Sequence, residues 1–167
     1  MTDKKPHLKS KPPLPDGETC FKFRYLHEIE SLAGSITKQF SSSMHVELGL
    51  TELMINALEH GNLNISYEDK RALNKENGAW EKEINRRLNL SENAGKYVEL
   101  RVITSGNKVQ FVLRDMGKGF DWKKFMDFDK DRISHTSGRG IALAKALSFS
   151  SLEYRRGGSE VVATIYY

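Results

Sequence analysis

Residues 44–61 read MHVELGLTELMINALEHG, and this stretch carries the clearest helical pattern in the chain. Its apolar residues recur at the spacing that puts them on one side of an amphipathic helix. They are Val46, Leu50, Leu53, Met54, Ala57 and Leu58. Gly61 follows directly and is of the residue type that commonly ends a helix. The stretch therefore predicts a helix over 44–60 with one apolar face.

Alternating apolar and polar residues before and after this helix predict strands. The stretches concerned are 20–26, 97–104, 108–114, 149–156 and 160–167. Short turn segments separate the second stretch from the third and the fourth from the fifth, which predicts two β-hairpins. Further helical patterns cover 27–40, the surroundings of Trp80, Ile84 and Leu88, and 141–147. Because helices and strands are grouped, we expect an α+β fold with helices on one face of a mixed, mostly antiparallel sheet.

The composition is that of an ordinary globular chain, with 38% apolar and 29% charged residues among 167, which favours a single domain. The first 17 residues hold all four prolines and no apolar run, so we expect a flexible arm rather than a secretion signal, followed by a domain over 18–167. The net charge of +4 is dispersed and gives no argument for nucleic-acid binding. No apolar stretch is long enough for a membrane span. The single cysteine, Cys20, excludes an internal disulfide and fits a cytoplasmic setting.

Three polar side chains of the 44–60 helix fall on one face. Glu52, Asn56 and His60 are spaced by four residues, and each step of four turns the helix by a net offset of only about 40°. An amide oxygen at this place suits Mg²⁺ that keeps most of its waters. A carboxylate can accept a proton from an attacking hydroxyl. The alternative is a polar helix edge with His60 near the C-terminal dipole.

Two glycine-containing segments follow in the second half of the chain. Residues 115–120 read DMGKGF directly after an expected strand, and the glycines allow the backbone to turn sharply and approach a ligand. Asp115 is a candidate acceptor for an exocyclic amine there, and a plain strand-exit turn is the alternative. Residues 137–140 read SGRG before a short helix, where free backbone N–H groups and Arg139 suit an anion. The alternative for this second segment is a loop with a helix cap.

In their order and spacing, the three groups resemble the ATP-binding module of the superfamily of gyrase, heat-shock chaperones, histidine kinases and MutL. The family motif E-x-x-x-N-A-x-x-H-G stands here over 52–61, the D-x-G-x-G motif over 115–119, and the second glycine motif over 138–140. The resemblance covers about residues 20–167. It implies a Bergerat-type fold, which is a two-layer α/β sandwich.

Within the superfamily, the chain is most similar to the bacterial anti-sigma-factor serine/threonine kinases. The H-G ending of the first motif, the short link of 18 residues from Phe120 to Ser137, and the S-G-R-G-I run are similar to theirs. Two features depart from the pattern. Ala142 stands where a third glycine is often found, and the segment 62–96 is a longer helical insert.

The resemblance implies ATP and Mg²⁺ as cofactors. Glu52 would be the general base, Asn56 would hold Mg²⁺, and Asp115 would accept a hydrogen bond from the adenine amino group. The residues implied to bind the nucleotide are Asn56, His60, Asp115, Gly117, Gly119, Ser137, Gly138, Arg139 and Gly140.

The implied activity is that of a cytoplasmic protein kinase in a partner-switching pathway. It would phosphorylate an antagonist protein on serine or threonine and hold a sigma factor in check, with a homodimer as a possible assembly. One alternative is a module that uses ATP only to sequester a partner. Another is a histidine-kinase-like ATPase domain that acts with a separate phospho-acceptor protein. Direct contact with nucleic acid or a membrane is not expected.

Overall fold

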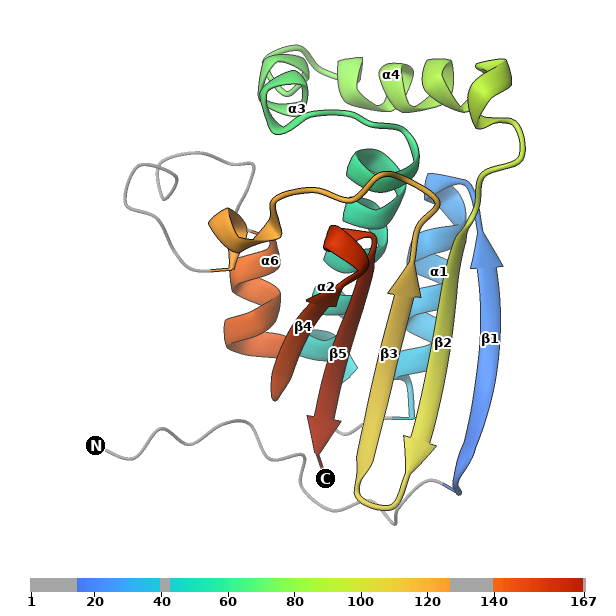
Figure 1. Cartoon of the computed structure of the whole chain (residues 1–167), viewed down its shortest axis with the longest axis vertical. Coiled ribbons are helices and arrows are strands. Elements are labelled where there is room, and N and C mark those ends of the chain that lie inside the picture. Colours follow the sequence, from blue (N-terminus) through green and yellow to red (C-terminus); the bar gives the residue numbers. More distant parts are fainter. Residues whose placement is uncertain (1–14, 40–42, 127–139, 167) are drawn as a thin grey trace.

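The computed structural model describes residues 15–39, 43–126 and 140–166. Five strands form one sheet in the order β1-β2-β3-β5-β4 (Figure 1). Their bounds are Gly17–Phe23 for β1, Val98–Ser105 for β2, Lys108–Arg114 for β3, Ser151–Arg155 for β4 and Glu160–Tyr166 for β5. Each pair of neighbours is antiparallel. The expected mostly antiparallel sheet is confirmed, and no parallel pair occurs among these strands.

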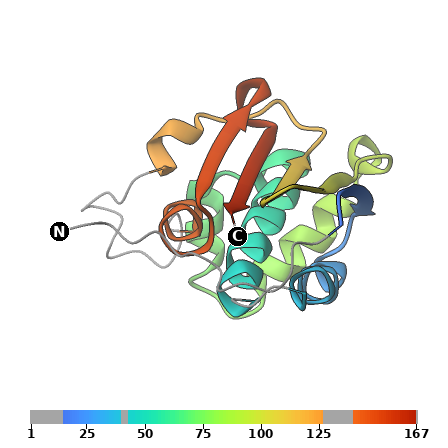
Figure 2. The ribbon, with the colours of Figure 1, turned by 90° about the horizontal axis from the view of Figure 1, so that it is seen from below.

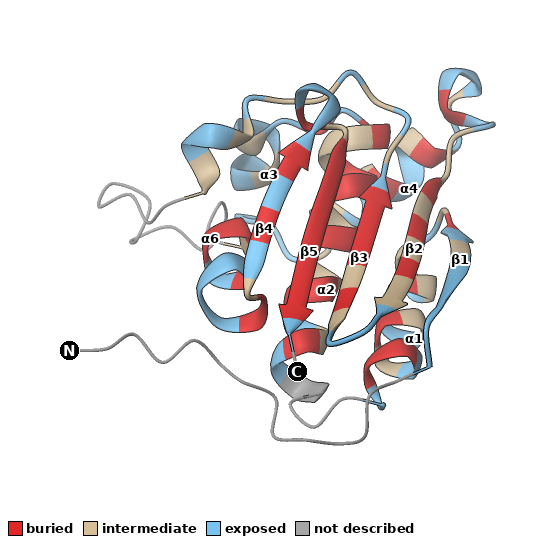
Figure 3. Ribbon diagram, turned by 60° about the horizontal axis from the view of Figure 1, so that its bottom comes forward, coloured by how far each residue is buried: buried red, intermediate tan, exposed pale blue. Residues whose placement is uncertain are grey.

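The helices cover one face of this sheet. Their bounds are Leu26–Thr37 for α1, Ser43–Asn56 for α2, Tyr67–Leu73 for α3, Ala79–Leu88 for α4 and Gly140–Leu143 for α6. Helices α1, α2 and α6 lie on the same side of the strands (Figure 2), and α3 and α4 lie at one end (Figure 1). Figure 3 looks onto the other face, which none of the described helices covers. The α+β sandwich predicted from the sequence is therefore confirmed.

The core fills the space between the sheet and α2. Alternate side chains of β3, from Val109 through Phe111 to Leu113, point inward and are buried with Leu50 and Leu53 of α2. Burial of each apolar side chain of this size contributes roughly 1.5–3 kcal/mol. The inward-facing residues of the strands and the apolar face of α2 therefore pack together in one hydrophobic core.

Among the element boundaries that differ from the sequence prediction, two concern the start of α1 and the end of the long helix. Leu26, expected to end the first strand, begins α1, because Glu28 of that helix accepts hydrogen bonds from the backbone N–H groups of Arg24 and Tyr25 at 2.8 Å. Gly61, expected to end the long helix, lies inside a π-helical segment over Ala57–Asn62. The helix thus continues past the predicted end.

The predicted insert over 62–96 is a helical subdomain rather than one short helix. It contains α3, which the sequence analysis did not predict, and α4, whose Ile84 and Leu88 are buried as expected. Arg24, which directly follows β1, contacts the C-terminal part of the insert. Its guanidinium group donates hydrogen bonds to the backbone oxygens of Leu88 and Asn93, both at 2.6 Å. The insert therefore forms side-chain hydrogen bonds with the rest of the domain in addition to its two chain connections.

The arm expected over residues 1–17 lies outside the described residues up to residue 14. Its last residues contact the β2–β3 hairpin: the Asp16 carboxylate accepts a hydrogen bond from the backbone N–H of Gly106 at 2.7 Å. Gly17 is already the first residue of β1. The folded domain thus begins slightly before the predicted boundary at residue 18.

Candidate functional site

A cavity of about 470 Å³ opens beside the C-terminal half of α2. Its volume is within the range typical of small-molecule sites, roughly 300–1,000 Å³. The lining residues come from four regions: α2 with its π-helical continuation, the start of the insert, the segment after β3, and α6. They are Glu52, Asn56, His60, Asn64, Ile65, Ser66, Tyr67, Glu68, Lys70, Gly119, Phe120, Asp121, Lys124, Phe125, Gly140, Ile141 and Leu143.

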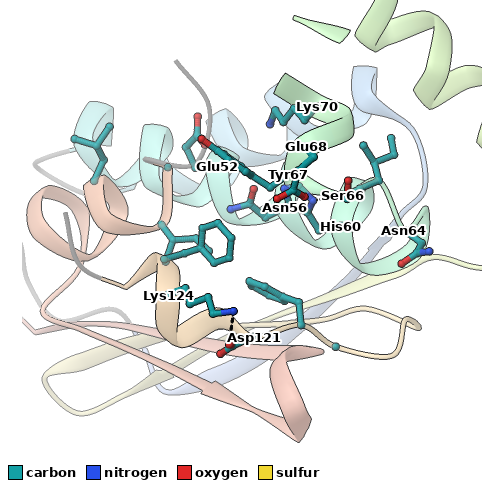
Figure 4. Close-up of a pocket in the computed structure, with 17 residues that line it drawn as sticks. Glu52, Asn56, His60, Asn64, Ser66, Tyr67, Glu68, Lys70, Asp121 and Lys124 are labelled. Carbon is teal, nitrogen blue, oxygen red and sulfur yellow. Dashed lines mark hydrogen bonds and ion pairs between the residues drawn. The ribbon is translucent and has the colours of Figure 1, made fainter. Parts of the chain in front are cut away.

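The predicted helix face lines this cavity. In Figure 4, Glu52, Asn56 and His60 follow one another along α2 and its continuation, and Asp121 and Lys124 lie across from them. The backbone changes to π-helix at Ala57, shown by the bond of 3.0 Å from the Leu63 N–H to the Leu58 oxygen five residues earlier. Such widened turns often occur at functional sites. The spacing argument for one shared face is therefore correct, although the last turn is not a regular α-helix.

Glu52 lies against the first residue of α6. A Cβ atom at Gly140 would stand 2.1 Å from Oε2 of Glu52, so a side chain at position 140 would require the Glu52 carboxylate to move. Burial raises the pKa of the Glu52 carboxyl above its ordinary 4.5, and the positive charge of Lys70 offsets part of that rise. The last glycine of the second glycine motif is thus in contact with the first motif.

The segment after β3 lies against the end of the first motif. A Cβ at Gly61 would lie 2.3 Å from Cγ of Asp115, and a Cβ at Gly117 would lie 2.1 Å from the Gly61 backbone oxygen. Gly119 has a φ of +79°, and a Cβ there would lie 2.1 Å from the Gly157 oxygen. These glycines allow three backbone segments to approach one another more closely than side chains would permit.

Asp115 itself does not line the cavity. It lines a gap of about 10 Å³ together with Phe120 and Tyr154, whose rings meet edge to face at 5.5 Å. This gap has room for about one water molecule and not for a nucleobase. Burial raises the pKa of Asp115 from 3.8 to about 6, and a hydrogen bond of 2.8 Å from the Gly117 N–H offsets part of the rise.

The sequence analysis missed a buried acid, Glu59, which is 0% exposed. Its carboxylate accepts hydrogen bonds from Lys70 Nζ at 2.6 Å and Trp80 Nε1 at 2.8 Å, and His60 Nε2 lies 2.9 Å away. Burial alone would raise the pKa of Glu59, but the hydrogen bonds and charges of His60 and Lys70 outweigh it and lower the pKa below 4.5. Glu59 lies in the π-helical segment, where the regular spacing of an α-helix no longer applies. Helical periodicity in the sequence therefore could not predict that this acid is buried.

Three of the residues predicted to bind the nucleotide, Ser137, Gly138 and Arg139, lie outside the described residues.

The predicted Mg²⁺ site is a separate question. The described residues contain no cluster of three His, Cys, Asp or Glu side chains that could hold a metal. A Mg²⁺ ion shared with phosphates needs only one or two protein oxygens. The Asn56 amide, which lines the cavity, can supply one such oxygen.

Comparisons with known proteins add no family assignment. No protein-family model matches this chain, and no curated protein matches it significantly. Among the helices of the described segments, none has both the length and the apolar character needed to cross a membrane. Interpretation of the cavity therefore rests on its own residues and on the motif resemblance.

Proposed function

We propose that this chain binds Mg-ATP in the cavity and transfers the γ-phosphate to a serine or threonine hydroxyl of a partner protein. One observation carries the proposal: two segments distant in sequence converge on the helix of the first motif. Gly140 lies against Glu52, and Asp115 and Gly117 lie against Gly61. In the second of these contacts the neighbouring atom is backbone, because a Cβ at Gly117 would lie 2.1 Å from the Gly61 oxygen, so a side chain there would displace the chain.

In the proposed reaction, Glu52 accepts the proton of the acceptor hydroxyl. The hydroxyl oxygen forms a bond to the γ-phosphorus, and the bond from that phosphorus to the bridging oxygen breaks, so that ADP leaves. A carboxylate whose pKa is raised by burial, as that of Glu52 is, is a stronger base than an exposed one. Mg²⁺ held by Asn56 would neutralise charge on the phosphates.

A base would reach Asp115 only after the gap beside it, of about 10 Å³, widens. A module that uses ATP only to sequester a partner needs the same pocket, so this gap does not distinguish it from the kinase. In the kinase proposal the partner is an anti-sigma antagonist, the controlled protein is a sigma factor, and the setting is the cytoplasm. These finer assignments come from the motif resemblance.

Binding is tested first by calorimetry with Mg-ATP. Wild type should bind in the micromolar range, and Asn56→Ala should weaken binding at least tenfold because it removes the proposed metal ligand. Asn85→Ala, on the exposed side of α4, is the matched control and should bind like wild type. Asp115→Asn should weaken ATP binding if the base reaches this carboxylate. Absence of binding by wild type would exclude the nucleotide proposal.

Transfer is tested with γ-labelled ATP and a mixture of serine- and threonine-containing peptides, analysed by mass spectrometry. Glu52→Gln keeps the shape of the side chain and removes the base, so it should abolish phosphopeptide formation while ATP binding persists. Glu81→Gln on exposed α4 is the control. ATP binding without any phosphopeptide, in wild type as well, would favour the sequestering module.

A further inference from the structure

The insert contributes a partly buried cation to the cavity. Lys70 belongs to α3, lines the cavity, and has a side chain that is only 19% exposed. Its Nζ lies 2.6 Å from Oε1 of Glu59 and 5.3 Å from the centroid of the Trp80 ring. The ion pair and the aromatic ring fix the position of the ammonium group. Figure 4 shows this residue on the same side of the cavity as Glu68.

The pair with Glu59 does not use the whole ammonium group of Lys70. Glu59 also accepts a hydrogen bond from Trp80 and lies against His60. An ammonium group carries three N–H donors, and Glu59 occupies one of them. The second lysine of the cavity, Lys124, forms an ion pair with Asp121 at 3.2 Å. Lys70 is therefore a fixed cation at the cavity wall with donors remaining for an anion.

Lys70 and Glu52 line the same cavity. The positive charge of Lys70 offsets part of the rise that burial causes in the pKa of Glu52. In the proposed reaction the γ-phosphate must lie beside Glu52, because that carboxylate receives the proton of the attacking hydroxyl. A cation within range of Glu52 is consequently within range of the terminal phosphates.

We propose that Lys70 binds the terminal phosphates of the nucleotide, with Glu59 and Trp80 as its positioning residues. The inference deepens the proposed function and rests on it. It assigns part of triphosphate recognition to the insert, outside the three motifs, and it predicts that the protein distinguishes ATP from adenosine through Lys70. A lysine can play this role because it presents a compact charge to phosphate oxygens.

The test compares binding of Mg-ATP and of adenosine to wild type, Lys70→Met and Lys70→Arg. Lys70→Met should weaken Mg-ATP binding at least tenfold and change adenosine binding by less than about twofold, since only ATP carries phosphates. Lys70→Arg should retain most of the ATP affinity. Lys82→Met, on the exposed side of α4, is the control for loss of a positive charge.

The outcomes separate three situations. Equal weakening of ATP and adenosine by Lys70→Met would overturn the inference, because it would show a purely structural role. Unchanged ATP binding would overturn it as well, while leaving the proposed function in place. Wild type that binds neither ligand would overturn the proposed function and the inference together. If Lys70→Met does not fold, the double variant Lys70→Met/Glu59→Gln removes both charges of the pair and is tested in the same way.

Discussion

Alanine at position 119 should destabilise the domain more than alanine at any of three comparison glycines. Gly119 combines a φ of +79° with a Cβ position only 2.1 Å from the Gly157 oxygen. Gly117 has the close approach alone, at 2.1 Å from the Gly61 oxygen, and Gly106 has a φ of +57° in open space. Gly95 has neither feature. The four positions therefore separate backbone strain from steric contact.

The expected magnitudes follow from these geometries. Gly106→Ala should lower the free energy of unfolding by roughly 1–2 kcal/mol, the cost of a left-handed residue with a side chain. Gly117→Ala should cost roughly 1–3 kcal/mol, because a backbone oxygen must move to admit the methyl group. Gly119→Ala carries both costs and should lose roughly 2–5 kcal/mol. Gly95→Ala should be neutral or stabilise by about 0.5 kcal/mol through the unfolded state.

Urea unfolding followed by circular dichroism measures all four variants under the same conditions. The denaturant slope should remain that of wild type, so that a change in midpoint reports stability alone. A Gly119→Ala variant no less stable than Gly106→Ala would refute the steric argument. The segment after β3 would then approach Gly157 less closely than described, or yield to a methyl group at little cost.

Two further changes test the carboxyl groups of Glu59 and Asp115. Glu59→Gln should lower the free energy of unfolding at neutral pH by about 3 kcal/mol, because it removes the charge that faces Lys70; a loss in urea unfolding no larger than that of exposed Glu81→Gln would contradict this. Asp115→Asn should remove a pH dependence. With a folded pKa of about 6 against 3.8, the wild-type carboxyl contributes stability that is complete below the lower value and lost as pH rises through the higher one. Wild type should therefore lose about 2 kcal/mol relative to the variant between about pH 4 and pH 7, and a constant difference would exclude the raised pKa.

Local periodicity accounts for what the sequence predicted correctly. The stripe through Leu50 and Leu53 and the alternation around Phe111 each repeat within a few residues, so the helix and the strands of the core could be located. The shared face of Glu52 and Asn56 follows from the same helical period. Patterns that repeat within a few residues were therefore enough to predict the main helices and strands and the helix face that lines the cavity.

Contacts between distant residues account for what was missed. Glu59 is held by Lys70 and Trp80, which lie 11 and 21 positions away, and only the folding back of the insert brings them together. Lys70 lies in α3, which the sequence did not predict, so no local pattern indicated its contact with Glu59. The sequence identified Gly61 as a residue that could end the helix. The structural reason for a glycine there is the close approach of Asp115, which depends on the packing of two separate segments.

The first and last residues of the insert are in contact, because Lys96 Nζ donates a hydrogen bond to the backbone oxygen of Asn62 at 2.9 Å. A segment whose ends meet can be shortened or deleted during evolution without displacing the elements on either side. In this chain such a deletion would remove Lys70 and Trp80 and leave a buried carboxylate without its lysine. Relatives that lack the insert should therefore carry an uncharged residue at the position of Glu59. The insert and the acid beneath it are expected to be gained and lost as a pair.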